Sequence, residues 1–252
     1  MKISIVTVRW MITRLFKIGN IKLVVKYERI VENSIKIILD ILGEVYQRVQ
    51  ESGMAEVFVF REISSMERVL QRRALEKNVS VLSLGMLSYH EVWTGIPTIY
   101  TSVEVSERYG EDLWKAVLQH EAGHTILHGS IVYYIPPVSE LSIEDEYIVF
   151  MGVKDYEVTR LLKQIGLGEY QEPLVRYNFS TDDKISLFKT LLQALPLAED
   201  LVWVNNKVRD ICRRKGIPLL LLEKFKYQLD KVEDTFERFR IACRWYKQYW
   251  KK

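Results

Sequence analysis

The spacing of apolar residues changes once along this chain, and the change limits the folds open to it. Between residues 21 and 105 the sequence holds short runs rich in β-branched side chains, typical of strands, with two helical segments among them. After Gly110 apolar residues recur every three or four positions, the period of a helix that buries one face. The sequence therefore predicts an α+β protein, with a mixed sheet and a backing helix first and a mainly helical C-terminal region after.

The predicted elements follow from these periods and from the turn residues between them. Strands are expected within residues 1–20 and at residues 21–27, 55–60, 80–88 and 97–105, the last of them half-buried. Helices are expected at residues 32–52, 66–77, 110–128, 144–164, 181–195, 198–215 and 219–250, with Gly53 ending the first. The loop at residues 166–180 predicts a boundary between one domain over residues 1–175 and a helical region over residues 176–252.

Composition excludes several classes of protein. With 48% hydrophobic and 27% charged residues among 252, the chain has ordinary globular composition, and its net charge of +3 does not by itself indicate a nucleic-acid partner. No apolar run approaches the roughly 20 residues of a membrane span. Because Arg9, Arg14 and Lys17 interrupt the apolar N-terminus, we expect no secretory signal and a cytoplasmic protein without membrane contact. Cys212 and Cys243 are expected to be buried free thiols, with a bridge between them as the alternative.

Three of the four histidines fall in one short string, QHEAGHTILHG, at residues 119–129. His120 and His124 are one helical turn apart, so they lie on one face with Cβ atoms about 5–6 Å apart. Two imidazoles at that spacing can share an ion, with bonds of about 2.0–2.1 Å to zinc. Glu121 projects about 100° round the helix from His120 and can reach a water on that ion. The pattern predicts a Zn²⁺ site with a general base beside it.

This string resembles the active-site helix of the zincin metallopeptidases, and its HExGHxxLH form is similar to the ImmA/IrrE-like branch. The resemblance covers residues 120–129. It implies a zincin-like catalytic region in the first domain, with His120 and His124 as ligands, Glu121 as general base and a downstream glutamate as third ligand. It also implies hydrolysis of a peptide or protein substrate, which we expect along a sheet edge near residues 97–105. The metzincin subclass is excluded, because Leu127 and Ser130 stand where it requires glycine and histidine.

The third ligand has several candidates in the predicted helix 144–164. Glu157 occupies one step of an otherwise apolar stripe, where a carboxylate is costly unless it is paired or bound to metal. It is therefore the first candidate. Asp155 is an alternative ligand, or could hold a ligand imidazole in place. Glu144, Asp145 and Glu146 complete the set, and each also suits the start of a helix.

Four further residues near the motif or the third ligand have two interpretations each. His128 fits a supporting role beside the metal ligands, or a place at the helix C-terminus where a cation suits the dipole. Tyr156 and Arg160 can donate to an oxyanion, or belong to ordinary packing and ion pairing. His90 stands alone before the motif, and a structural histidine is the favoured interpretation.

The C-terminal tail carries six cations and no acid between Arg238 and Lys252, interleaved with aromatic residues. Such a mixture can bind an acidic partner or nucleic acid, which gives a second hypothesis: a nucleic-acid-associated regulator with a zinc site. The favoured interpretation of the tail is packing with a solvated basic face, because Ile241, Trp245 and Tyr249 form a helical stripe. A purely structural metal site is a third hypothesis. Glu121 argues against it, because a structural site needs no acid beside its ligands.

Overall fold

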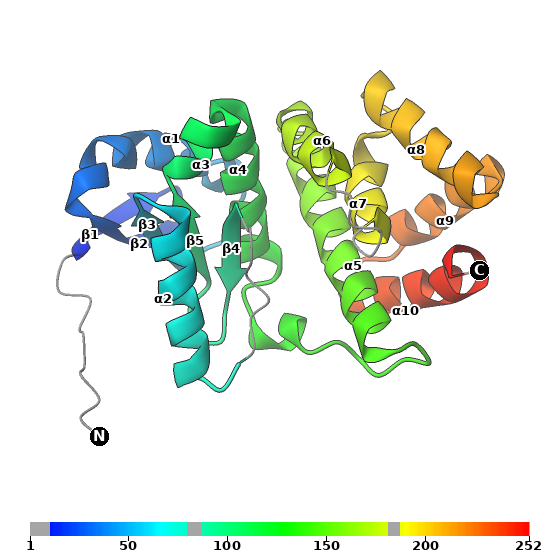
Figure 1. Ribbon diagram of the computed structural model, residues 1–252, viewed down its shortest axis with the longest axis horizontal. Helices are drawn as coiled ribbons and strands as arrows, with labels where there is room; N and C mark the ends of the chain where they lie inside the picture. Colours follow the sequence, from blue (N-terminus) through cyan, green and yellow to red (C-terminus); the bar gives the residue numbers. More distant parts are fainter. Residues whose placement is uncertain (1–10, 80–86, 181–186, 252) are drawn as a thin grey trace. The chain divides into compact units, whose positions relative to one another are not determined.

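The protein is described by a computed structural model covering residues 11–79, 87–180 and 187–251 (Figure 1). It divides into two compact units, Met1–Ile131 and Val132–Lys252. The first unit holds the sheet and the second is helical, so the α+β prediction is confirmed. The division does not fall near residue 175. Residues expected to form a linking loop are instead helical, in η3 (Glu169–Gln171) and α6 (Glu172–Ser180).

Among the described residues, five strands form one mixed sheet in the order β1-β2-β3-β5-β4. The strands are β1 (Met11–Ile18), β2 (Ile21–Glu28), β3 (Gly53–Phe60), β4 (Ser88–Glu91) and β5 (Thr98–Ser102). The central three, β2, β3 and β5, run parallel, whereas β1 and β4 pair antiparallel at the two edges. Parallel neighbours need crossover connections, which the helices between these strands supply.

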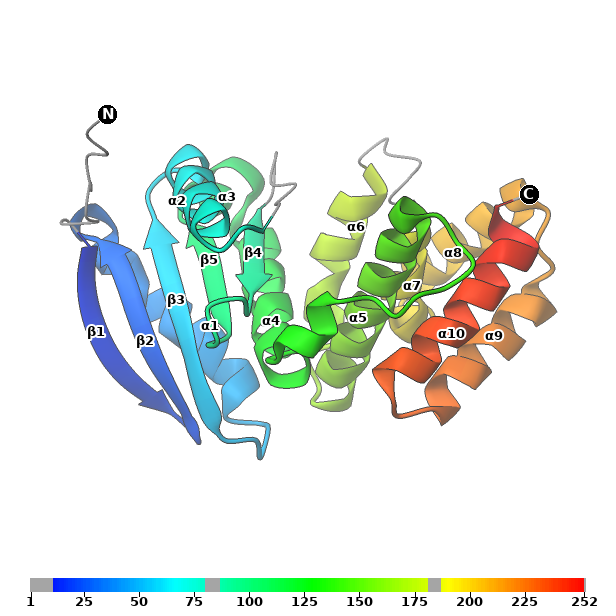
Figure 2. The same ribbon diagram turned by 90° about the horizontal axis from the view of Figure 1, so that it is seen from below.

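Helices cover both faces of this sheet (Figure 2). They are α1 (Ile35–Tyr46), α2 (Ile63–Glu76), α3 (Glu104–Tyr109) and α4 (Glu111–Leu127). Phe58 and Tyr100 cluster with Met66 and Leu70 of α2. On the neighbouring position of β5, the Thr101 hydroxyl accepts a hydrogen bond from the Trp114 indole of α4 at 3.0 Å. Because successive strand residues point to opposite faces, α2 and α4 lie on opposite sides of the sheet.

The strand expected at residues 97–105 differs from its prediction in two ways. All five residues of β5 are buried, not alternate ones, because the strand lies inside the sheet with helices on both faces. Residues 104 and 105 belong to α3, not to the strand. The edge of the sheet is therefore β4. Most of the strand expected at residues 80–88 lies outside the described residues, and only Ser88 of that range begins β4.

Two helix boundaries also differ from expectation. The helix expected at residues 32–52 starts with a 3-10 turn, continues as α1 and ends at Tyr46, whereas Gly53 is the first residue of β3. The helix expected at residues 219–250 is broken into α9 (Leu219–Lys231) and α10 (Thr235–Trp245). Asp234 causes the new start, because its carboxylate accepts a hydrogen bond from the Glu237 backbone N–H at 2.8 Å and caps α10.

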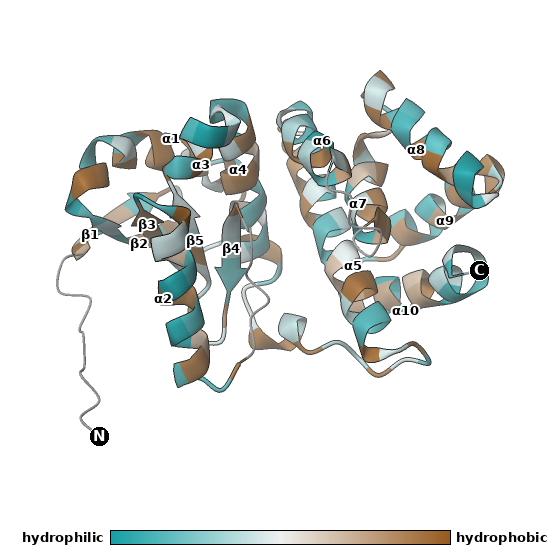
Figure 3. Ribbon diagram, in the orientation of Figure 1, coloured by the Kyte–Doolittle hydropathy of each residue, from teal (hydrophilic) through white to brown (hydrophobic). Residues whose placement is uncertain are grey.

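The second unit packs its helices around a core of aliphatic and aromatic side chains. Its remaining helices are α5 (Ile143–Gln164), α7 (Leu187–Ala194) and α8 (Val202–Lys215). Hydrophilic and hydrophobic stretches alternate along α8, as in a helix with one buried face (Figure 3).

Both cysteines are free and buried, as expected, and burial raises the pKa of Cys212 to about 11 and that of Cys243 to about 12.

The basic C-terminal tail is part of this core. Its buried aromatic side chains are Phe239, Trp245, Tyr246 and Trp250. Each described cation of the tail has a carboxylate neighbour: Arg238 with Glu157, Arg240 and Arg244 with Glu237, Lys247 with Glu140, and Lys251 with Asp145. These contacts agree with the packing interpretation of the tail.

Membrane crossing was not expected from the sequence. Over the described ranges, every helix is too short or too polar for a bilayer span.

A buried carboxylate in the first unit gives a testable pH dependence. Glu91 of β4 is fully buried, accepts a hydrogen bond from the Tyr100 hydroxyl at 3.1 Å and lies 3.8 Å from the Arg73 guanidinium. Burial raises the pKa of this carboxyl above its ordinary value of 4.5, and Arg73 and Tyr100 offset only part of that effect. The native state therefore holds this proton more tightly than the unfolded chain does.

We predict that Glu91→Gln gains stability relative to the wild type as pH rises. The stabilising proton of Glu91 is bound below pH 4.5 and is lost as pH rises through the raised pKa, whereas the amide of the variant has no proton to lose. Unfolding free energies from urea titrations at pH 5 and pH 7.5 measure the difference. A wild-type minus variant difference that is the same at both pH values would contradict the prediction.

Candidate metal centre

The helix α4 carries the histidine string and is held by polar contacts along its length. At its start, the Trp114 indole donates to Thr101 of β5. In the middle, the side chains of Lys115 and Gln119 donate to the two carboxylate oxygens of Glu44 on α1, at 2.7 and 2.8 Å. Near its end, the hydroxyls of Tyr46 and Thr125 lie 2.9 Å apart, which ties α4 to α1 again. The backbone that presents the histidines is therefore fixed.

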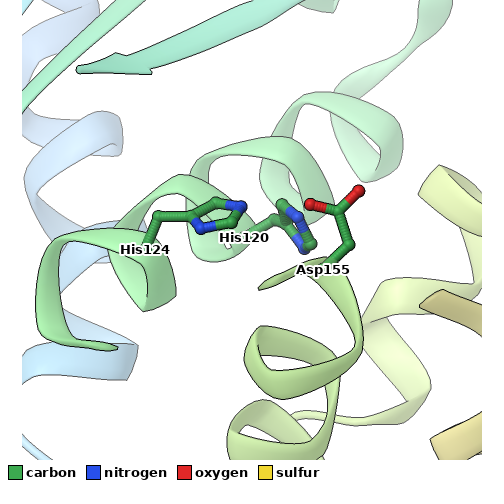
Figure 4. A group of neighbouring side chains, drawn as sticks. All are labelled: His120, His124 and Asp155. Carbon is green, nitrogen blue, oxygen red and sulfur yellow. The ribbon is translucent and has the colours of Figure 1, made fainter. Parts of the chain in front are cut away.

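The two imidazoles of the HExxH pattern are neighbours. The ring centroids of His120 and His124 are 4.8 Å apart and their planes meet at 82°. Both side chains are buried, with 6% and 5% of their residue surface exposed. Figure 4 shows them on α4. Glu121, the next residue after His120, is only partly buried, so its carboxylate keeps access to solvent.

The other two histidines of the chain join this group. His128 is fully buried, and its Nδ1 atom lies 2.9 Å from Nδ1 of His124. One of these two nitrogens donates to the other, and in the tautomer in which Nδ1 of His124 is the donor, its Nε2 carries the lone pair that a ligand atom needs. His90 of β4 is also buried and stacks on His124, with ring centroids 5.7 Å apart. We call His90, His120, His124 and His128 the histidine cluster.

Sequence reasoning missed the place of His90. It pairs with Ile99 in the sheet, so it lies on the same side as Thr101, the side that α4 covers. That position follows once β4 is known to run antiparallel beside β5. The sequence prediction did not extend a strand to His90 and gave no signal for its register.

In the second unit, Glu157 of α5 has a partner for each carboxylate oxygen. Arg238 of α10, itself buried, donates to Oε1, and the Thr235 hydroxyl donates to Oε2 at 2.9 Å. A buried carboxylate needs a partner, and here α10 supplies one. The expectation that Glu157 is the third ligand therefore gains no support from these contacts.

The two expected oxyanion donors of α5 also have partners within the second unit. The Tyr156 hydroxyl donates to Asp230 of α9, and the Arg160 guanidinium lies 3.7 Å from the same carboxylate. Burial, followed by the hydrogen bond to Asp230, raises the pKa of Tyr156. These contacts are those of helix packing between α5 and α9.

The remaining acidic candidates separate into two kinds. Glu144, Asp145 and Glu146 lie in the first turn of α5, where carboxylates suit the helix dipole. Asp155, in contrast, is deep in the helix and 3% exposed, and its Oδ2 atom lies 3.2 Å from the Lys189 ammonium of α7. Figure 4 labels its side chain on α5. Asp155 is thus a buried carboxylate that contacts a cation of its own unit through Oδ2.

We predict that His128→Phe weakens zinc binding by about 10- to 100-fold, because ligand imidazoles depend on the group that holds their second nitrogen. Chelator competition measures the zinc dissociation constant. The matched comparison is Tyr46→Phe, which removes a hydroxyl contact of the same helix at Thr125, and it should weaken zinc binding less than His128→Phe because it touches no ligand imidazole. Equal zinc affinity in His128→Phe and wild type would show that His128 does not support His124.

Comparison with protein-family models, curated proteins and solved structures gives no match to this chain. The likeness to the zincin active-site helix therefore stays limited to residues 120–129.

Proposed function

We propose that the protein is a cytoplasmic zinc-dependent peptidase in which Glu121 is the general base. One observation carries the proposal: two buried imidazoles, His120 and His124, lie side by side on α4, with Glu121 next to the first of them. Removing two imidazoles from water is unfavourable unless their nitrogens bind hydrogen-bond partners or a metal. Burial of both cysteines as free thiols fits a reducing compartment.

For the third ligand we propose Asp155 in place of Glu157. Asp155 is the alternative carboxylate of α5, and it is 3% exposed. Two imidazoles and one carboxylate are a donor set that suits zinc, with a fourth position left for water or substrate. Glu157 serves Arg238 and Thr235 instead.

The chemistry divides between the ion and the chain. A bound zinc ion would supply a Lewis acid for the scissile carbonyl and lower the pKa of the attacking water. Glu121 accepts the proton of that water and passes it to the leaving amine, a role that its partial exposure allows. His128, through its contact with Nδ1 of His124, keeps the second nitrogen of that ligand in place.

We propose β4 as the strand that positions the peptide substrate. Among the described strands it is the edge next to α4, whereas β5, near which substrate was expected from the sequence, is enclosed by β3 and β4. An edge strand offers backbone N–H and C=O groups to an extended peptide. His90, on β4 and stacked on His124, links this edge to the histidine cluster.

The nucleic-acid hypothesis is the weaker proposal. Stacking on bases requires exposed aromatic rings, but Phe239, Trp245 and Trp250 are packed in the core of the second unit. An acidic partner would also compete with the carboxylates that already neighbour the cations of the tail.

We predict that Glu121→Gln retains zinc and loses hydrolysis by about 10²- to 10⁴-fold, since only the general base is removed. Zinc content by elemental analysis and cleavage of a mixed peptide library give the two measurements. A wild-type protein that binds zinc and cleaves none of a broad range of peptides would count against the peptidase, as would a fully active Glu121→Gln.

A second prediction separates the two candidate ligands. Asp155→Asn should lose zinc, whereas Glu157→Gln should keep one zinc per chain and lower the free energy of unfolding by about 3–5 kcal/mol, because it leaves Arg238 buried without its counter-ion. Zinc stoichiometry and urea unfolding measure these effects. Zinc loss in Glu157→Gln together with zinc retention in Asp155→Asn would restore Glu157 as the ligand.

A further inference from the structure

The helix α8 of the second unit carries a large excess of positive charge. Its one acid is Asp210, and its cations are Lys207, Arg209, Arg213, Arg214 and Lys215. The net charge of this helix is therefore +4, which exceeds the +3 of the whole chain. Because like charges repel one another, such a helix is favoured when an anionic partner lies close to it.

The apolar and the cationic side chains of α8 lie on different faces. The side chains that α8 buries in the core of the second unit are Val204, Val208, Ile211 and Cys212. Because each residue turns a helix by about 100°, Asn206, Arg209 and Arg213 lie on the opposite side. All three are exposed. Arg214 is exposed beside them, and we call these four residues the outer face of α8.

One carboxylate of the described residues serves the cations of this face. Arg213 and Arg214 share Asp210, at 3.7 and 3.0 Å, while their side chains stay 79% and 62% exposed. The Arg209 guanidinium donates to the neutral side-chain oxygen of Asn205 at 2.9 Å, a contact that orients it and leaves its charge in place. The outer face therefore keeps a positive charge.

Phosphate is an anion that suits these side chains, because a planar guanidinium can bind it through two parallel hydrogen bonds. Arg209 and Arg213 are one helical turn apart, about 6 Å along the axis at 1.5 Å per residue. Double-stranded DNA carries one negative charge per about 1.7 Å of its own axis. A fixed row of guanidinium groups can thus contact more than one phosphate of a duplex.

Two other anionic partners suit the outer face less well. A helix that lies on a membrane inserts apolar side chains into the lipid, but the apolar side of α8 is buried in the core, except for Val202 at its start. A single-stranded nucleic acid stacks its bases on aromatic rings. The outer face as defined holds asparagine and arginine and no ring.

We propose that the outer face of α8 binds the phosphate backbone of double-stranded DNA without reading its sequence. The driving force is the release of counter-ions from the DNA as the arginines replace them. This surface differs from the C-terminal tail, whose aromatic rings are packed in the core. It is also separate from the proposed peptidase, since none of the candidate metal ligands belongs to α8.

Stabilisation of the helix end is the alternative role of these cations. Arg213 and Arg214 lie in the last turn of α8, where positive charge suits the helix dipole. In that case their loss lowers the free energy of unfolding and leaves the affinity for DNA unchanged. Arg209 lies before the last turn, so the dipole does not account for it.

The test is the affinity of the full chain for a fluorescent DNA duplex of about 20 base pairs, measured by anisotropy at salt concentrations from about 50 to 200 mM. Arg209→Gln/Arg213→Gln removes two phosphate contacts, so the slope of log Kd against log salt should fall by about 2. Arg209→Lys/Arg213→Lys keeps both charges and should keep the slope. Arg209→Gln alone should lower it by about 1, which serves if the double variant folds poorly.

The matched control is Arg240→Gln/Arg244→Gln. It removes the same charge from the second unit, at two exposed arginines of α10 that share Glu237 as Arg213 and Arg214 share Asp210. Its slope should equal that of the wild type. Melting curves by circular dichroism check that each variant is folded.

Several results would overturn the proposal. They are a wild-type chain that does not bind the duplex at low salt, an unchanged slope in the folded α8 variants, and a control slope that falls as far as theirs. Tighter binding to a single strand of equal length, or binding to phosphatidylserine vesicles in place of the duplex, would assign the face to another partner. All these results leave the zinc content and the peptidase proposal untouched.

Discussion

The candidate site depends on the contacts that hold α4 against β5 and against α1. Glu44 of α1 binds two side chains of α4, and Trp114 binds Thr101 of β5. These contacts fix both the height and the rotation of the helix, because side chains on a helix keep their direction relative to the backbone. With that rotation set, His120 and His124 point to one place, and His128, one turn further, reaches His124.

Buried charge in the second unit is arranged by pairs from different helices. Arg238 of α10 and Glu157 of α5 are each about as buried as the histidines, and each satisfies the other. Breaking such a pair costs more than the pair contributes, because one charge is left without a partner in a medium of low dielectric. The helix α10 is thereby coupled to α5, which also carries Asp155, so the packing of the C-terminal tail bears on the geometry of the proposed ligand.

The sequence correctly predicted those features that depend on residues close together along the chain. The fold class, the helix with the HExxH pattern and the helix α5 were all correct in kind, since their signals lie within one or two helical turns. For Glu157, the sequence could not identify the partner of the carboxylate. A carboxylate in an apolar stripe can serve a metal or an arginine, and its partner Arg238 lies 81 residues away, so no local pattern distinguishes the two. The place of His90 and the enclosure of β5 were likewise set by strand pairing over long range.

β4, the shortest strand of the described sheet, determines by its register which side chain lies on each face of the sheet. In β4, the His90 side chain stacks on His124 while Glu91, the next residue, points to the opposite face and accepts a hydrogen bond from the Tyr100 hydroxyl. Strand side chains alternate with a period of two, so a slip of the pairing by one residue would exchange them. A carboxylate would then enter the cluster and an imidazole would lie beneath α2. The place of His90 on the α4 side of the sheet and the place of Glu91 on the α2 side thus both depend on the register of the four residues of β4.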